Sequence, residues 1–428
     1  MKFFKVSLFS SLITIIRILS GFVISKLVAL YVGPAGVALL GQFTNFSTIV
    51  FSLSNGSIGT GVVKYTAEYQ DDYVQTKKLF STSFRISLYC SVFIGLLVVL
   101  FCQSLSKIVL FSDSYYSIFI VFGIAIVFFS LNTLFSSILN GKSEIKNYSN
   151  INIVTTIINV IISVVLVKYF KLYGALFSVC FLHFFTFLYS IVVLRKQEWF
   201  SKTYFAESID KKTLLKLGGF SLIAITGAIS VPLSQMFVRD LIVSQLGIES
   251  AGYWQGMMRV SDGYLMIILT SLSLYYLPKL SSLKTELELA KEIIFAFKVY
   301  IPITLIGCIG IYFFRFFIID VLYTKEFYSM EDLFFYQLLG DVMKVASCIL
   351  GYLLIAKAKT KTAVLTESFF ALMLYVLSFF LIKEIGLNGV TFAFFINYMI
   401  YFIILLYVFR DTVFLIWQLI FKTDKIGI

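Results

Sequence analysis

Charged residues are scarce in this 428-residue chain, where Asp, Glu, Lys and Arg together make up 14% of the positions. A typical soluble domain has about 25%. Hydrophobic residues make up 59%, and they form continuous runs of about 20 residues, the length that a helix needs to cross the hydrocarbon core. An outer-membrane barrel would instead have short, alternating segments. These features exclude a soluble globular protein and predict an all-α integral membrane protein.

Motifs for catalysis and metal binding are also lacking. The five cysteines form no CxxC pair, and His183 is the one histidine, interpreted as a helix-packing residue. The sequence contains no G-x-x-x-x-G-K-[ST] motif, no zinc motif and no convincing dinucleotide fingerprint. We therefore predict a protein that is not an enzyme, has no metal, cofactor or disulfide, and binds no nucleic acid.

The apolar runs predict about twelve transmembrane helices, the first of them a retained span rather than a cleaved signal peptide. They are residues 6–31, 37–62, 79–101, 115–139, 148–168, 173–194, 214–243, 250–277, 293–314, 332–356, 362–382 and 388–409. An even number places both termini on one side of the membrane. Most Lys and Arg residues outside the spans then fall on that side, which the positive-inside rule assigns to the cytoplasm. We predict a multi-pass protein of the bacterial inner membrane with cytoplasmic N- and C-termini.

The chain repeats itself at an offset of 215 residues. Lys168 and Gly174 recur as Lys383 and Gly389. The apolar positions Leu172, Phe177, Phe187 and Val193 recur at the same offset. A constant offset predicts two pseudo-symmetric six-helix bundles related by an axis along the membrane normal.

This repeat sets the predicted domain boundaries. The bundles are residues 1–194 and 217–410, joined by a polar, basic cytoplasmic linker at residues 195–216. Residues 411–428 form an interfacial or cytoplasmic tail, because their apolar stretch is too short to span the bilayer.

Several charges lie inside or at the ends of the predicted spans, where each costs roughly 2.5–3.5 kcal/mol or more unless it faces water or a partner. The basic ones are Arg17, Lys26, Arg85, Arg239, Arg259, Lys298 and Lys344. The acidic ones are Asp240, Asp262, Asp341 and Glu367. Bases outnumber acids, so the membrane interior is net positive and suits an anionic substrate. The basic set is the predicted substrate-binding site for an anionic headgroup.

The acidic residues suggest a second role. Asp341 and Lys344, like Arg259 and Asp262, are three residues apart and can pair on one helix face. Such pairs are either structural or gates that open during transport, and Asp262, Asp341 and Glu367 are the predicted gating or coupling residues.

The basic residues also have alternative interpretations. Arg85, Arg259 and Lys298 lie near a membrane surface and can extend their charges into it. Arg17 and Lys26 point to opposite sides of one helix, since nine residues make two and a half turns. Arg17, at mid-depth, is the better candidate for facing a transport cavity.

Several stretches resemble Wzx-type flippases, the polysaccharide transporters of the multidrug/oligosaccharidyl-lipid/polysaccharide (MOP) superfamily. They include Lys26-Leu-Val-Ala-Leu-Tyr-Val-Gly-Pro-Ala-Gly36, Lys64-Tyr-Thr-Ala-Glu-Tyr69 and Gln337-Leu-Leu-Gly-Asp341-Val-Met-Lys344. Trp254-Gln-Gly256, Tyr276-Leu-Pro-Lys-Leu-Ser281 and Gly351-Tyr-Leu-Leu-Ile-Ala-Lys357 match as well. The matches extend over both predicted halves. Within the family they are most similar to flippases of the enterobacterial common antigen, followed by those of O-antigens.

The resemblance implies a MATE-like fold and a function. The substrate would be an undecaprenyl-pyrophosphate-linked oligosaccharide such as an O-antigen repeat unit. It would move from the cytoplasmic to the periplasmic leaflet by alternating access through a cationic central cavity. Membrane lipid, and polymerase or chain-length proteins of the polysaccharide pathway, are the implied partners. Lys26, Arg239, Asp262, Asp341 and Lys344 lie in or beside the matching stretches.

Two other functions are compatible with a multi-pass membrane protein. A MATE-like, cation-coupled drug or metabolite antiporter would need carboxylates within the N-terminal bundle, yet its predicted spans have no acidic residue at mid-depth. A scaffold that recruits other enzymes would give the buried bases little purpose.

Overall fold

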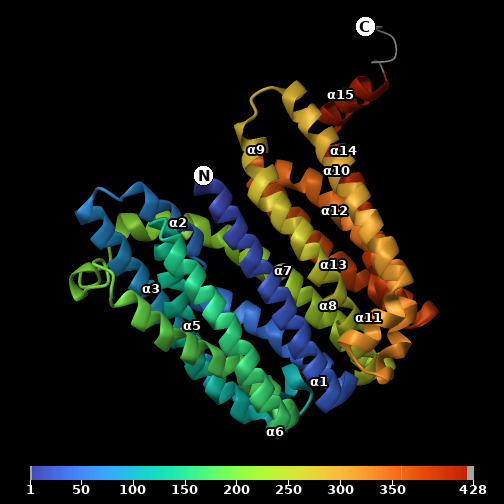
Figure 1. The fold of residues 1–428 in the computed structure, drawn as a ribbon, viewed down its shortest axis with the longest axis horizontal. Helices are drawn as coiled ribbons and strands as arrows, with labels where there is room; N and C mark the ends of the chain where they lie inside the picture. Colours follow the sequence, from blue (N-terminus) through green and yellow to red (C-terminus); the bar gives the residue numbers. More distant parts are fainter. Residues whose placement is uncertain (1, 358, 422–428) are drawn as a thin grey trace. The chain divides into compact units, whose positions relative to one another are not determined.

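The structure, a computed structural model, describes residues 2–357 and 359–421. Helices are the regular elements throughout this range (Figure 1). Nine of the described helices are long and apolar enough to cross a membrane, and α7 (Lys211–Leu246), which is bent by 43°, makes a tenth. The prediction of an all-α, multi-pass membrane protein is confirmed. The described chain divides into two compact units, Met1–Met236 (unit 1) and Phe237–Ile428 (unit 2).

Unit 1 is built from four long helices, α1, α3, α5 and α6, and several short ones, with α7 continuing from it into unit 2. Its elements are α1 (Lys2–Ser54), α2 (Gly59–Glu68), α3 (Tyr73–Leu100), α4 (Cys102–Leu110), η1 (Asp113–Tyr115), α5 (Tyr116–Gly141), α6 (Ile145–Leu194) and η2 (Lys202–Tyr204). Helix α6 packs along both α1 and α5, and α3 packs along α5 (Figure 1).

The two longest helices are interrupted by single residues with non-helical backbone. In α1 the break is Gly33 (φ 76°, ψ −169°), followed by Pro34, whose fixed φ and missing N–H suit the start of a new helical segment. In α6 the break is Lys171 (φ 51°, ψ −124°). Just beyond it, Gly174 lies so close to the carbonyl of Leu166 that a side chain would not fit. Each of these helices therefore consists of two segments.

Small residues let α3 approach α5 closely. Ser83, Ser87, Ser91 and Gly95 follow one another at four-residue spacing and are all buried. A Cβ added at Gly95 would lie 2.5 Å from the carbonyl oxygen of Gly123 on α5. Such rows of small residues are typical of helix contacts in membranes, where close packing replaces the hydrophobic effect as the driving force.

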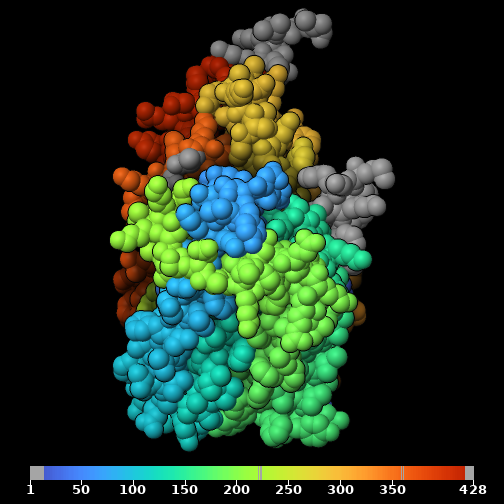
Figure 2. Space-filling model, turned by 90° about the vertical axis from the view of Figure 1, so that its left-hand side faces the viewer, coloured from blue at the N-terminus to red at the C-terminus, as the bar shows by residue number. Residues whose placement is uncertain are grey.

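The segment after α6 packs against unit 1. Trp199 is buried, and Phe205 packs on the same apolar cluster as Phe80. The backbone of the segment also pairs with α3, since Ser81 Oγ donates to the carbonyl of Tyr204 at 3.1 Å. Figure 2 shows this segment lying over α3 on one face of unit 1. Much of the region predicted as a linker is therefore an ordered part of unit 1.

Asp210 ends this segment and caps α7. Its carboxylate accepts hydrogen bonds from the backbone N–H and the hydroxyl of Thr213, both at 2.9 Å. These bonds favour the ionised form, so they lower the pKa of Asp210 from its usual value. An ionised carboxylate at this position also suits the positive end of the α7 dipole.

Unit 2 begins within α7. Its further elements are α8 (Ile248–Ser271), the π-helix η3 (Leu272–Tyr276), α9 (Leu277–Ser282), α10 (Glu286–Phe313), α11 (Arg315–Leu322), η4 (Lys325–Leu333), α12 (Phe334–Ala356), α13 (Thr360–Ile385), α14 (Asn388–Val408) and α15 (Arg410–Phe421). Helix α12 lies at its centre and contacts α8, α10 and α14. The turns at Gly247 and Gly386 both have positive φ.

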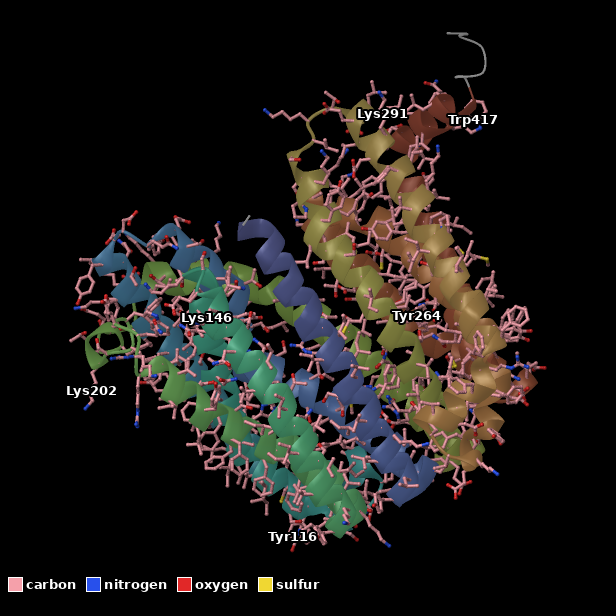
Figure 3. All side chains as sticks on the ribbon, in the orientation of Figure 1. Tyr116, Lys146, Lys202, Tyr264, Lys291 and Trp417 are labelled. Carbon is pink, nitrogen blue, oxygen red and sulfur yellow. The ribbon has the colours of Figure 1, made fainter. Side chains whose placement is uncertain are left out.

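Helix α15 is held at one end of unit 2. Glu286 at the start of α10 accepts hydrogen bonds from Lys357 Nζ at 2.6 Å and from Thr412 Oγ1 at 3.1 Å. Phe414 and Trp417 stack on each other and are exposed, and Trp417 lies at the same end of unit 2 as Lys291 (Figure 3). An exposed aromatic pair beside basic residues is typical of a helix that lies at a membrane surface.

Candidate functional site

A buried carboxylate with a complete set of donors lies within unit 2. Asp341 on α12 is fully buried. Its two oxygens accept from Ser261 Oγ at 2.7 and 2.8 Å and from the Tyr264 hydroxyl at 2.6 Å, both on α8. Gln337 Nε2, one turn earlier on α12, donates at 3.3 Å. Figure 3 shows Tyr264 among the helices of unit 2. Neutral side chains thus supply the hydrogen bonds to the Asp341 carboxylate, and no ion pair recorded between described residues includes it.

The basic partner of this cluster pairs with a different acid. Lys344 Nζ lies 3.6 Å from Asp262 on α8, and it also lies over the rings of Phe394 and Tyr398 on α14, at 5.8 and 6.0 Å. The sequence allows a pair of Lys344 with Asp341 on one helix face, whereas the ion pair recorded within 4.0 Å is with Asp262, which the neighbouring helix α8 presents. The ion pair therefore joins α8 to α12.

Arg239 is the most deeply buried of the predicted site residues that carry a positive charge, with 1% of its surface exposed. It donates a hydrogen bond to Gln255, and its guanidinium lies 5.3 Å from the ring centroid of Trp254. Both partners are on α8, so Arg239 links the end of α7 to α8 inside unit 2. Trp254 itself is buried, whereas the preceding residue, Tyr253, is partly exposed.

The predicted basic residues of unit 1 are more accessible. Arg17 on α1 is exposed and donates from Nη2 to Asn152 Oδ1 on α6 at 3.5 Å. Lys26 is half-buried on the same helix. Arg85 on α3 donates to the carbonyl of Ala206 at 3.4 Å. None of the ion pairs recorded between described residues includes Arg17 or Arg85.

The remaining predicted residues lie at the surface of unit 2. Arg259, Lys298 and Glu367 are exposed, and no described ion pair includes them. Lys298 borders a small, otherwise apolar cavity of about 180 Å³ formed by α10, α12, α14 and α15. The sequence allows a pair of Arg259 with Asp262, and the ion pair that the structure records at Asp262 is with Lys344.

The structure thus brings together three of the predicted residues: Asp262, Asp341 and Lys344. Ser261, Tyr264 and Gln337, which complete this cluster, were not predicted. Gln337 lies four residues before Asp341 on the same helix, a spacing that indicates contact between the two side chains. Ser261 and Tyr264 belong to another helix, and their role depends on how α8 packs against α12.

His183 packs between aromatic side chains, in agreement with its interpretation as a helix-packing residue. Its ring makes edge-to-face contacts with Phe51 and Phe129, with centroids 4.6 and 4.9 Å away. No group of three or more His, Cys, Asp or Glu residues able to hold a metal ion occurs among the described residues.

Comparison with solved structures defines the class of protein. An inward-facing multidrug resistance MATE family transporter of the MOP superfamily is similar, with a TM-score of 0.79 at 14% identity, covering 94% of this chain and 95% of that one. A MOP superfamily transporter from Pyrococcus furiosus, whose binding pocket is described as having reversed polarity, gives 0.61 at 13% identity over 95% and 96%. The protein is a multi-pass membrane protein with the MOP-type fold.

The family follows from the sequence match. The chain belongs to the polysaccharide biosynthesis protein family, whose sequence model matches residues 5–284. It is also 28% identical over 402 residues to the lipid III flippases of Escherichia coli K12 and Shigella flexneri, covering 94% of this chain and 97% of each relative. The family predicted from the sequence is confirmed.

Proposed function

We propose that this protein is a flippase for undecaprenyl-pyrophosphate-linked oligosaccharide, such as an O-antigen repeat unit. It moves this lipid from the cytoplasmic to the periplasmic leaflet of the bacterial inner membrane by alternating access through a cationic central cavity. Family membership and the similarity to lipid III flippases support the substrate class. Polymerase and chain-length proteins of the same pathway are the proposed partners.

The positive charge within unit 1 is the observation that carries this proposal. Arg17 and Lys26 on α1 and Arg85 on α3 lie in candidate membrane spans, and the sequence places no acidic residue at mid-depth there. Each base within a span raises the cost of the empty state. A pyrophosphate lowers that cost because guanidinium and ammonium groups replace its hydration with charge-assisted hydrogen bonds.

The membrane potential favours the proposed direction. With the inside negative, outward movement of one negative charge releases about 2.3 kcal/mol per 100 mV. Moving an anionic headgroup from the cytoplasmic to the periplasmic leaflet therefore requires no ATP hydrolysis by this chain.

We propose that the ion pair between Lys344 and Asp262 is the gating element of unit 2. It joins α8 to α12, and Asp262 is about half exposed, so an incoming pyrophosphate can compete with it for Lys344. Asp341 stays bonded to Ser261 and Tyr264 and holds α8 and α12 together while the pair opens. Glu367, exposed on α13, is a further coupling candidate.

We further propose twelve spans in two related halves, with both termini in the cytoplasm. Counting the segments on either side of Gly33 and Lys171 separately supports this number. The backbone breaks also recur at the offset of the repeat: Lys171 has φ 51° and ψ −124°, and Gly386 has φ 61° and ψ −142°. Gly389 crowds the carbonyl of Leu381 as Gly174 crowds that of Leu166.

The domain boundaries follow from this proposal, with bundles at residues 1–194 and 217–410, a connection at 195–216 and a tail at 411–428. Lys146 and Lys202 lie toward one end of unit 1 and Tyr116 toward the other (Figure 3). Under the positive-inside rule the basic end is the cytoplasmic one.

Complementation in cells tests the proposal. In a strain that lacks its own flippase but supplies the matching glycan, Arg17→Gln and Lys344→Gln should each reduce surface polysaccharide at least tenfold, because each removes a charge from the proposed anion path. Lys291→Gln, at an exposed base outside that path, is the matched control and should retain wild-type levels. Wild-type polysaccharide in both path variants, at equal protein abundance, would contradict the proposal.

A further inference from the structure

A row of neutral polar residues runs along the first segment of α6, within an otherwise apolar sequence. Asn152, Thr156, Asn159 and Ser163 follow at spacings of four, three and four residues, which places them on one face of the helix. The row rises about 16 Å along the axis, roughly half the thickness of the hydrocarbon core. Polar side chains at this depth are costly and almost always face a protein interior or a water-filled cavity.

Helix packing accounts for only part of this row, because Thr156 and Ser163 are buried but the two asparagines are not. Apart from one bond from α1, the hydrogen bonds of the row stay within α6: Thr156 Oγ1 donates to the carbonyl of Asn152 at 2.9 Å, Asn152 Nδ2 to that of Tyr148 at 2.8 Å, and Ser163 Oγ to Asn159 Oδ1 at 3.4 Å. Both asparagines are partly exposed. Asn152 uses both ends of its amide, as a donor to Tyr148 and as an acceptor from Arg17. No hydrogen bond recorded among the described residues uses Asn159 Nδ2. Structural polar residues in membranes typically bond across helices, so the Asn159 amide is the group of the row most open to a ligand.

Asn150 offers a contrast on the same helix. It lies almost opposite the row, and its Nδ2 donates at 2.8 Å to the hydroxyl of Tyr189 in the second segment of α6. This bond ties the two segments together, as expected of an amide with a structural role.

Among the described residues, Arg17 is the one hydrogen-bond partner of the row that comes from another helix. Its Nη2 donates to Asn152 Oδ1 at 3.5 Å, and α1 packs along α6 (Figure 1). One neutral acceptor at this distance leaves most of the five N–H donors of the guanidinium for a ligand. An anionic group bound there would place whatever is attached to it beside the amides of α6.

We infer that the partly exposed amides of this row, Asn152 and Asn159, form a sugar-binding subsite that takes hydroxyl and amide groups of the sugars nearest the pyrophosphate. This inference rests on the proposed function, in which Arg17 binds the pyrophosphate. An asparagine amide offers two donors and a carbonyl acceptor, which matches the paired donors and acceptors of a sugar ring. Asn159 lies about two turns beyond Asn152 along α6. It therefore contacts the sugar and not the pyrophosphate.

Binding by the full-length protein in nanodiscs tests the inference with two probes, undecaprenyl pyrophosphate and undecaprenyl-pyrophosphoryl-N-acetylglucosamine. The wild type should bind the sugar-bearing probe about tenfold more tightly. Asn159→Val should remove that difference while binding undecaprenyl pyrophosphate as before. Arg17→Gln should weaken both probes, and Asn150→Val, off the row, should change neither. If Asn159→Val is not recovered folded, Asn159→Thr replaces it, because it also lacks the amide.

The outcomes separate the inference from the proposed function. Equal binding of the two probes by the wild type, or an unchanged sugar preference in the Asn159 variant, overturns the subsite while leaving the pyrophosphate site intact. Failure of the wild type to bind either probe overturns the proposed function itself.

Discussion

At the scale of single residues, Asp341 and Arg17 represent two ways of placing a charge in a membrane protein. Asp341 is enclosed by donors from its own helix and from α8, and its charge is satisfied within unit 2. Arg17 meets a single amide at 3.5 Å. The first arrangement stabilises helix packing, whereas the second fits the ligand-binding role proposed for Arg17. A charge in a span is therefore a weaker guide to function than the set of partners around it.

Removing a donor from Asp341 should destabilise unit 2. Ser261→Ala deletes the hydroxyl that donates to both carboxylate oxygens and leaves a fully buried group under-satisfied, a loss of about 1–3 kcal/mol. We expect a lower melting temperature for the purified protein. Ser281→Ala, which removes an exposed hydroxyl on α9, should melt with the wild type. Equal melting temperatures for all three proteins would show that Asp341 does not depend on Ser261.

At the scale of elements, the contact of α3 with α5 depends on residues that have almost no side chain. Gly95→Ala would place a methyl group 2.5 Å from the carbonyl oxygen of Gly123, and backbone cannot move aside as a flexible side chain can. Overpacking of this kind typically costs 1–3 kcal/mol. We expect a clear decrease in the melting temperature of the Gly95→Ala protein.

The matched control for this substitution is Gly310→Ala on α10. No atom lies within 4 Å of the position that the new methyl group would take. Alanine also favours helix by up to about 1 kcal/mol over glycine, so this variant should be as stable as the wild type or slightly more stable. If Gly95→Ala melted like Gly310→Ala, the close approach of α3 and α5 would not contribute to stability.

Elements whose signals are local could be predicted from the sequence. The runs of apolar residues gave the long helices, and the Gly33–Pro34 pair marked the break in α1. The ordered packing of Trp199 and Phe205 against α3 was not predicted, because a polar, basic segment has the composition of a flexible connection. Its few aromatic residues, rather than its average polarity, determine where it lies.

Contacts between helices were predicted less well. The three-residue spacing of Asp341 and Lys344 indicated a pair on one helix, but Lys344 reaches Asp262 on α8. Spacing describes one helix at a time, and the neighbouring helix decides which of two possible partners is nearer. The amides of α6 were not predicted. Asparagine carries no charge that marks its position in a span, although its amide has both hydrogen-bond donors and an acceptor.

At the scale of the whole molecule, the distribution of charge links the family to a mechanism. The chain carries a formal net charge of +12, and Arg17 and Lys26 add positive charge within a candidate span of unit 1. Unit 2 pairs its half-buried Lys344 with an acid. In the proposed function, the bases of unit 1 attract the pyrophosphate, and the pair of Lys344 with Asp262 in unit 2 opens and closes again, so that neither set of charges binds the headgroup irreversibly.

Translocation in proteoliposomes tests this account most directly. The measurement is the rate at which fluorescent undecaprenyl-pyrophosphoryl-N-acetylglucosamine becomes accessible to a membrane-impermeant quencher. The account predicts a rate at least tenfold above that of protein-free liposomes, a return to the protein-free rate with Arg17→Gln and Lys344→Gln combined, and no transport of uncharged undecaprenol. An unchanged rate in the double variant, or equally fast movement of undecaprenol, would contradict the claim that the intramembrane bases carry an anionic headgroup.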